Sequence, residues 1–211
     1  MNKIYKVGLI GCGHISETYF RAHEYFNNFK IIKCADIKEG ASKNCASLYN
    51  IESVSVDDLL ADNQIEVVLN LTTPQAHYEV TKKTLLAGKH SYCEKPLSTK
   101  FENGQELVNL AKEKNLYLGN GPDTFLGAGS QKSRQLIDSG LVGDIKLGNA
   151  IFAFPGVQSY HPDPEPWFQK DGGGPVMDMG TYYLTVLVNL LGPAKQVQGC
   201  ELTVSEFREI G

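Results

Sequence analysis

Asp178 and Tyr182 lie four residues apart at the start of an apolar helical pattern, shortly after the glycines Gly172 to Gly174. Side chains at that spacing share one face of a helix. A carboxylate and a phenol on one face could bind a hydroxylated substrate, and the glycines would let the loop pass close to it. The same pattern also fits a flexible loop followed by a core helix. A P-loop phosphate site is excluded, because no Lys-Ser or Lys-Thr follows the glycines.

A second group of residues could hold a dinucleotide. Gly11 and Gly13, in GLIGCGHIS, lie where an apolar strand turns into a helix, and Ser16 takes the third position of the glycine fingerprint. Such glycines let the backbone approach a pyrophosphate, which then rests on the helix N-terminus. Asp36 follows Gly13 by 23 residues, near the spacing at which a carboxylate binds ribose hydroxyls. We therefore expect NAD, while Lys38 leaves NADP open. The predicted cofactor-binding residues of this turn are Gly11, Cys12, Gly13, His14 and Ile15.

The elements that would position these residues alternate between strand and helix over residues 1–121. Apolar runs predict strands at 3–11, 30–36, 65–72, 90–93 and 116–121. Helical patterns occupy 14–26, 39–50, 74–89 and 99–115, the last with Thr99 and Glu102 in capping-box spacing. This rhythm predicts an α/β fold: a Rossmann-type, doubly wound parallel sheet with helices on both faces.

The rhythm fades after residue 121. A helix is predicted at 127–140, a long strand at 144–154, an apolar helix after the glycines and a last strand at 194–204. We therefore expect residues 122–211 to be an incomplete α+β domain with an open mixed or antiparallel sheet.

Composition narrows the function classes. The chain has 211 residues and a net charge of −4, which argues against a nucleic-acid or anionic-membrane surface. No apolar run is long enough to span a bilayer, and the N-terminal apolar stretch reads as a strand rather than a signal peptide. Five scattered cysteines without CxxC spacing predict reduced thiols, a cytoplasmic protein and no metal.

Two further motifs carry a family resemblance. CEKPLS (Cys93 to Ser98) follows the predicted strand at 90–93, and TTPQAH follows the strand at 65–72. Together with the glycine fingerprint and GGGPVMDMGTYYL, they resemble the glucose–fructose oxidoreductase, inositol dehydrogenase and rhizopine-catabolism family (Gfo/Idh/MocA). The resemblance implies hydride transfer between a nicotinamide and a carbinol carbon of a sugar, polyol or related compound. It adds to the predicted cofactor site Leu71, Thr72, Thr73, Pro74, His77, Glu94, Lys95 and Pro96.

The resemblance also implies catalytic roles for Lys95, Asp178 and Tyr182. Lys95 would contact the substrate oxygen. The family's histidine is replaced by Tyr182 and a later aspartate by Thr185. Tyrosine has a pKa of about 10, against about 6.5 for histidine, so Tyr182 can be the base if Lys95 stabilises its phenolate. Alternatively Tyr182 shapes the pocket, and His161 or His77 carries the proton. Predicted substrate contacts are Asp123, Phe125, His161 and Trp167.

Family members normally continue with several more strands, so the resemblance implies a chain truncated in its C-terminal domain. The resemblance implies that residues 122–211 serve in substrate binding and oligomerisation. The exposed sheet of such a domain would favour a homo-oligomer. The tyrosine at position 182 and the missing strands keep a second function open, namely a non-catalytic dinucleotide-binding relative, either a sensor or a degenerate homologue.

Overall fold

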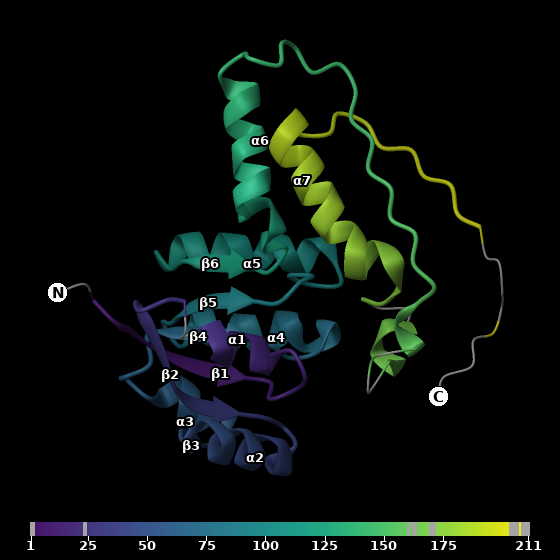
Figure 1. Cartoon of the computed structure of the whole chain (residues 1–211). Coiled ribbons are helices and arrows are strands. Elements are labelled where there is room, and N and C mark those ends of the chain that lie inside the picture. The colour runs from purple at the N-terminus through teal and green to yellow at the C-terminus, as the bar shows by residue number, and fades with distance from the viewer. Residues whose placement is uncertain are drawn as a thin grey trace. The chain divides into compact units, whose positions relative to one another are not determined.

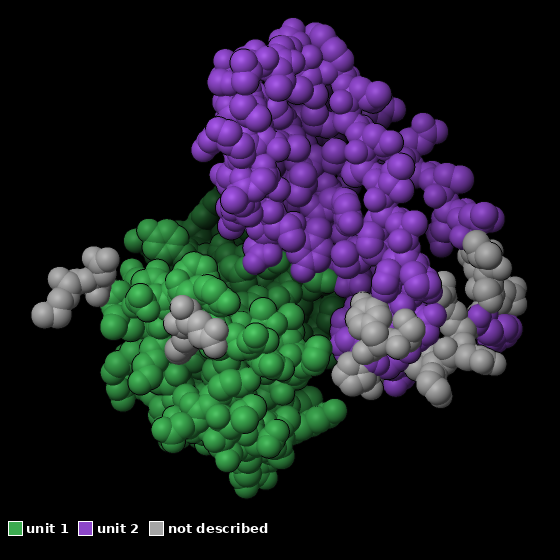
Figure 2. Space-filling model, in the orientation of Figure 1, with its two compact units in different colours: residues 1–121 green, residues 122–211 purple. Residues whose placement is uncertain are grey.

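The computed structural model describes residues 3–22, 25–159, 161, 164–168, 172–202 and 207. The chain divides into two compact units, Met1–Gly121 and Pro122–Gly211 (Figure 2). Each unit is described here by itself. No helix in the described residues is long and apolar enough to cross a membrane.

Unit 1 is built on a six-stranded sheet in the order β3-β2-β1-β4-β5-β6, in which every strand pair is parallel (Figure 1). The strands are β1 (Tyr5–Ile10), β2 (Phe29–Ala35), β3 (Glu52–Ser53), β4 (Val67–Asn70), β5 (His90–Cys93) and β6 (Leu118–Asn120). The order reverses between β1 and β4. In open parallel sheets the crevice beyond the strand ends at such a reversal is where ligands bind.

Among the described residues of unit 1, five α-helices cover the sheet. They are α1 (Ser16–Arg21), α2 (Glu39–Tyr49), α3 (Val56–Ala61), α4 (Pro74–Leu86) and α5 (Phe101–Glu113). Val7 and Leu9 of β1 pack in one apolar cluster with Phe20 of α1 and Cys45 of α2. Ile10 points to the other face, where it joins Leu59 of α3 in a second cluster. Both faces of the sheet are therefore buried, which explains the continuous apolar runs.

The predicted strands and helices of unit 1 are confirmed, with differences at their ends. The structure adds β3 and α3, which were not predicted because β3 has two residues and α3 has six. The start of α3 nevertheless carried a signal, since Ser55 caps it by accepting a hydrogen bond from Asp58 N at 3.0 Å. The predicted capping box at Thr99 is wrong. Helix α5 begins at Phe101 with Lys100 in the cap position and no side-chain cap.

Unit 2 contains two α-helices among its described residues, α6 (Ala128–Asp138) and α7 (Thr181–Leu191). A π-helical turn, Val176–Gly180, leads directly into α7. Three 3-10 turns occupy Asp123–Leu126, Val157–Ser159 and Glu165–Phe168. Arg134 of α6 ties the two helices together, because its Nη1 donates to Asn189 O at 2.9 Å and to Leu190 O at 3.0 Å. These carbonyls lie at the end of α7, where no intrahelical partner remains.

The two strands predicted in unit 2 are not formed in the described residues, so the expected sheet is a wrong prediction for this part of the chain. Residues 144–154 and 194–202 have no regular secondary structure, and residues 203–204 lie outside the described residues. A strand exists through hydrogen bonds to a neighbouring strand, and these segments have no strand neighbour. The first segment instead packs on α7, with the ring of Phe152 centred 5.5 Å from that of Tyr183. Tyr183, the neighbour of the predicted site residue Tyr182, is thus half-buried against this segment.

Candidate functional site

The turn after β1 is shaped by two glycines with different surroundings. Gly11 has φ = 100°, and a Cβ on it would lie 2.6 Å from the carbonyl of Leu71. Only glycine fits there, because the position combines a left-handed φ with a close approach to the loop after β4. Gly13 is exposed, and no atom lies within 4 Å of the position its Cβ would take. The turn therefore packs closely on one side and is open on the other, as a pyrophosphate site requires.

Asp36 reaches this turn from the carboxyl end of β2. Its Oδ2 accepts a hydrogen bond from Cys12 N at 2.7 Å, and its Oδ1 accepts one from Lys38 N at 2.8 Å. Two backbone donors fix the orientation of the carboxylate. Each oxygen has a second lone pair for a ribose hydroxyl. The residues present thus fit a dinucleotide: an open glycine turn for the phosphates and a fixed carboxylate for the sugar.

Asn70, at the end of β4, organises the loop that follows. This residue was not predicted as a site residue. Its side chain is fully buried and makes four hydrogen bonds. Its Nδ2 donates to His77 O at 3.0 Å and to Thr81 Oγ1 at 2.9 Å. Its Oδ1 accepts from the Thr72 hydroxyl at 2.7 Å and from Thr72 N at 3.3 Å. The side chain of Asn70 therefore fixes the loop that contains the predicted cofactor residues Leu71 to Pro74. A polar residue ending an apolar strand was the sequence signal.

His77 braces this loop against the Glu-Lys-Pro motif. The imidazole is 1% exposed, with Nδ1 at 2.6 Å from Pro96 O and Nε2 at 2.9 Å from Thr72 O. Burial lowers the pKa of His77, and the two carbonyl oxygens oppose that shift. Because the ring is buried and both nitrogens are engaged, the alternative in which His77 carries the substrate proton is contradicted. Its predicted part in cofactor binding stays a prediction, since the contacts of its ring are with the backbone of Thr72 and Pro96.

Glu94 anchors the motif that carries Lys95. Its Oε1 accepts from the hydroxyl of Tyr19 at 2.7 Å, and its Oε2 accepts from Lys95 N at 3.0 Å. Asn120 of β6 donates through Nδ2 to Cys93 O at 2.9 Å and to Glu94 O at 3.1 Å. Sequence reasoning missed Tyr19 and Asn120, because they lie far from the motif in the chain. Lys95 is half-buried and is joined to the buried Pro96 by a cis peptide bond.

The predicted residues of unit 2 fall into two groups. Asp178 lies in the π-helical turn and Tyr182 in the first turn of α7, and both are half-buried. Single π turns inside helices occur frequently at functional sites. The rings of His161 and Trp167 lie 4.2 Å apart between centroids, so these two predicted substrate residues pack on each other.

The remaining two predicted substrate residues lie in the turn Asp123–Leu126, where Asp123 is exposed and Phe125 is half-buried. Gln131 of α6 fixes that turn by donating from Nε2 to Phe125 O at 2.9 Å. The predicted catalytic residues are divided between the units: Lys95 belongs to unit 1, whereas Asp178 and Tyr182 belong to unit 2. Their shared role stays a prediction.

Comparisons with known proteins agree with the geometry of unit 1. Residues 5–121 match the model of the Gfo/Idh/MocA oxidoreductase family with its NAD-binding Rossmann fold, and residues 130–206 match a C-terminal domain of the same family. An uncharacterized oxidoreductase of Schizosaccharomyces pombe is 31% identical over 74% of this chain and 42% of its own length. A D-xylose dehydrogenase of Paenarthrobacter nicotinovorans is 29% identical over 77% of this chain and 42% of its own.

Solved structures give the same result. The WlbA dehydrogenase of Bordetella pertussis, in complex with NADH and UDP-GlcNAcA, superposes with a TM-score of 0.80 at 25% identity. The alignment covers 92% of this chain and 57% of the dehydrogenase. The chain spans about half the length of the curated relatives it matches. With its glycine turn, its fixed Asp36 and its Glu-Lys-Pro motif, the chain belongs to the Gfo/Idh/MocA family of oxidoreductases.

Proposed function

We propose that unit 1 binds NAD and that the whole protein transfers a hydride between the nicotinamide and a carbinol carbon of a sugar, a polyol or a related compound. The observation that carries the proposal is the junction of Asp36 with the glycine turn. The hydrogen bond from Cys12 N to Asp36 Oδ2, at 2.7 Å, aligns the ribose-binding group with the phosphate-binding turn. Relatives named as a D-xylose dehydrogenase and as a 1,5-anhydro-D-fructose reductase support the substrate class.

The preference for NAD over NADP follows from the same carboxylate. The 2′-phosphate of NADP would place negative charge beside Asp36, whose oxygens are held in place by Cys12 N and Lys38 N. Lys38 is the nearby cation that could offset this repulsion, and its side chain is exposed. An exposed ammonium offsets little charge repulsion in water. NAD is therefore the proposed cofactor.

The chemical roles follow from what alcohol oxidation needs. The bound nicotinamide supplies the hydride acceptor. Lys95 stabilises the negative charge that develops on the substrate oxygen. Tyr182 or His161 takes the hydroxyl proton, and Asp178 hydrogen-bonds a substrate hydroxyl. Asp123, Phe125 and Trp167 are the proposed substrate contacts.

Calorimetric titration of the purified chain with NAD and NADP, each in turn, tests the cofactor assignment. We expect NAD to bind more tightly than NADP. The Asp36→Ala variant should bind NAD at least tenfold more weakly, because it loses two charge-assisted hydrogen bonds to the ribose. The control is Asp57→Ala, which removes an exposed carboxylate from α3 and should leave NAD affinity unchanged. Equal NAD affinity in the wild type and in Asp36→Ala would contradict the proposal.

A second candidate function is dinucleotide binding without catalysis. The tyrosine at position 182, where the family pattern has histidine, favours it. The two functions differ in one measurement, the absorbance of reduced nicotinamide when sugars and polyols are offered with NAD. Turnover that disappears in Lys95→Met supports the enzyme. NAD binding without turnover on any sugar, polyol or sugar nucleotide supports the non-catalytic relative.

A further inference from the structure

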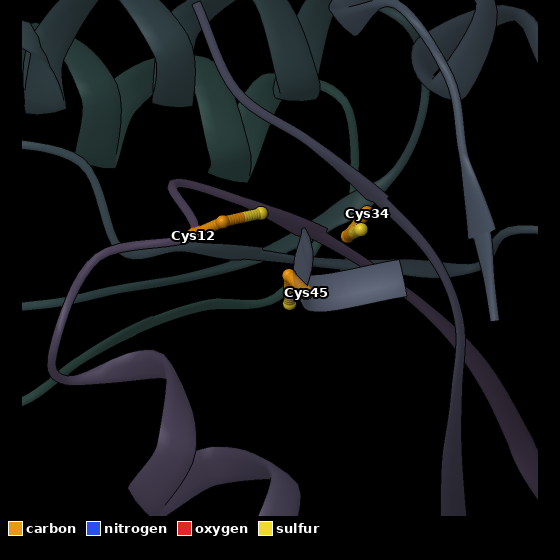
Figure 3. A group of neighbouring side chains, drawn as sticks. All are labelled: Cys12, Cys34 and Cys45. Carbon is orange, nitrogen blue, oxygen red and sulfur yellow. The ribbon is translucent and has the colours of Figure 1, made fainter. Parts of the chain in front are cut away.

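Three cysteines that are scattered in the sequence meet beside the dinucleotide turn. Cys12 lies in the turn after β1, Cys34 in β2 and Cys45 in α2, and their sulfur atoms all lie within 4.8 Å of one another (Figure 3). The parallel pairing of β1 with β2 brings the first two together, and α2 lays the third over β2. The sequence was predicted to hold no metal. Spacings of 22 and 11 residues gave no signal, because the fold alone assembles the cluster.

The surroundings of the three thiols suit a soft metal ion. Cys34 and Cys45 are buried in the apolar cluster beneath the sheet, and Cys12 is half-buried at its edge, which leaves an entry path. Two of the thiols donate weak hydrogen bonds, from Cys12 Sγ to Ala35 O at 3.7 Å and from Cys34 Sγ to Ser42 O at 3.4 Å. A thiol is a weak donor, so these contacts are released at little cost.

The number of ligands decides the kind of ion. Among the described residues, no fourth cysteine, histidine or carboxylate joins this group. Structural zinc sites are almost always four-coordinate, whereas soft thiolates also select Cu(I). Three sulfurs bound at about 2.3 Å around one ion lie about 4 Å apart, so the cluster must contract by less than about 1 Å. A disulfide is the alternative use of these thiols. It would engage only two of the three sulfurs, which would have to lie about 2.05 Å apart.

We propose that Cys12, Cys34 and Cys45 form a trigonal thiolate site for a soft monovalent ion of the Cu(I) class. Binding replaces the thiol protons, which go to solvent, and no group changes its oxidation state. Affinity therefore rises with pH.

The site is coupled to the dinucleotide turn through Cys12, a step that rests on the proposed NAD binding. Cys12 N holds Asp36 Oδ2 at 2.7 Å, and Cys12 stands between Gly11 and Gly13. Three thiolates around one monovalent ion leave a net charge of −2 beside the turn proposed for the NAD phosphates, which repels them. We expect the ion to weaken NAD binding by about tenfold, and NAD to weaken the ion by the same factor.

The metal site is tested without NAD, by anaerobic titration of the full chain with Cu(I) in competition with the chromogenic chelator bicinchoninate. We expect one tightly bound Cu(I) per chain. Each of Cys12→Ser, Cys34→Ser and Cys45→Ser should weaken Cu(I) binding at least tenfold. The matched control is Cys200→Ser, which removes an exposed thiol from outside the cluster and should change nothing. Wild-type affinity in Cys34→Ser and Cys45→Ser would overturn the proposal.

A measurement on the wild-type chain covers the case in which a core variant fails to fold. Labelling with N-ethylmaleimide followed by mass spectrometry should show that one equivalent of Cu(I) protects Cys12 and leaves Cys200 reactive. Protection of Cys200 alone would overturn the site. A mass lower by two hydrogens with no copper bound would also overturn it, because it would show that a disulfide had formed instead. Calorimetry with NAD on the copper-loaded chain then tests the coupling. If Cu(I) binds but NAD affinity is unchanged, the site stands and its coupling to NAD is wrong.

Discussion

His77 Nδ1 lies 2.6 Å from the carbonyl oxygen of Pro96, and through this contact the loop after β4 holds the segment that carries Lys95. The other ring nitrogen reaches Thr72 O, so one buried imidazole ties two loops of the candidate site together. In this chain, the histidine of TTPQAH is a positioning residue for the Glu-Lys-Pro motif. Both of its ring nitrogens contact backbone carbonyl oxygens.

Replacing His77 with leucine should destabilise the protein and misplace Lys95. A neutral ring donates to one of the two carbonyls, and leaving that buried oxygen without a donor costs about 1–3 kcal/mol of the free energy of unfolding. Urea denaturation measures this change. The control is Glu79→Ala, an exposed position on the same helix α4, which should change stability by less than about 0.5 kcal/mol. An unchanged urea midpoint in His77→Leu would show that the contacts of the His77 ring with the two carbonyls do not stabilise the protein.

Stability should fall on mild acidification because of the same histidine. Burial lowers the pKa of folded His77, so the unfolded chain binds a proton first as the pH drops below its ordinary value of about 6.5. The stability that depends on a neutral His77 is fully present above the unfolded-state pKa. It is lost as the pH falls from there to the lower pKa of the folded state, with a slope of at most about 1.4 kcal/mol per pH unit. Urea midpoints at pH 7.5 and 5.5 measure the loss. A His77→Gln variant should lose less stability over that range. Equal losses would assign the effect to other groups.

Gly11 and Gly13 should respond differently to a single methyl group. Gly11→Ala places a Cβ 2.6 Å from backbone and strains a positive φ, so we expect a loss of about 2–4 kcal/mol in unfolding free energy. Gly13→Ala meets no atom within 4 Å and should leave stability within about 0.5 kcal/mol. Its methyl group nevertheless enters the space proposed for the pyrophosphate, so NAD affinity should drop. Thermal melts and NAD calorimetry separate the two effects. Unchanged NAD affinity in Gly13→Ala would place the phosphates elsewhere.

The Tyr19→Phe variant tests the hydrogen bond to Glu94, which anchors the motif that carries Lys95. The phenol donates to Glu94 Oε1 at 2.7 Å, and a hydrogen bond to a charged group contributes about 1.5–3 kcal/mol. We expect a loss of stability in that range, together with a lower kcat once a substrate is known. The paired control is Tyr25→Phe, because Tyr25 is 78% exposed. If both variants melt together with the wild type, Glu94 is held by its backbone contacts alone.

The Arg134→Met variant should destabilise the last turn of α7 in unit 2. The variant keeps most of the apolar stem but removes the donors to Asn189 O and Leu190 O. We expect faster hydrogen exchange in the last turn of α7, with about 1–3 kcal/mol less local protection. Lys132→Met is the matched control on α6, and its side chain is exposed. Identical exchange in the two variants would contradict the capping role of Arg134.

The sequence was most informative where one pattern repeats. Strand-helix alternation and the glycine turn after β1 predicted the sheet of unit 1 and the junction with Asp36, because each signal is local. Unit 2 was predicted less well, since residues 144–154 have a strand's composition but no strand neighbour. Composition reports a preference, whereas a sheet needs a second strand in register.

The supporting residues of the site were harder to predict than its motifs. Tyr19 and Glu94 are 75 residues apart, and Cys12 and Cys45 are brought together by the packing of α2 against the sheet. Neither pair has a spacing that a sequence pattern could detect. His77 was recognised by its motif, but its role was not. Burial and the two carbonyl contacts decide that role, and both arise from tertiary structure.

The four hydrogen bonds of the Asn70 side chain have a thermodynamic consequence. Every polar group of this buried amide is satisfied by the protein itself, so the loop from Leu71 to Pro74 has its shape before any ligand arrives. A preorganised loop gives up little conformational entropy on binding. Calorimetry of NAD should therefore show an association with a small entropic penalty, and Asn70→Ala should enlarge that penalty before it weakens any direct contact.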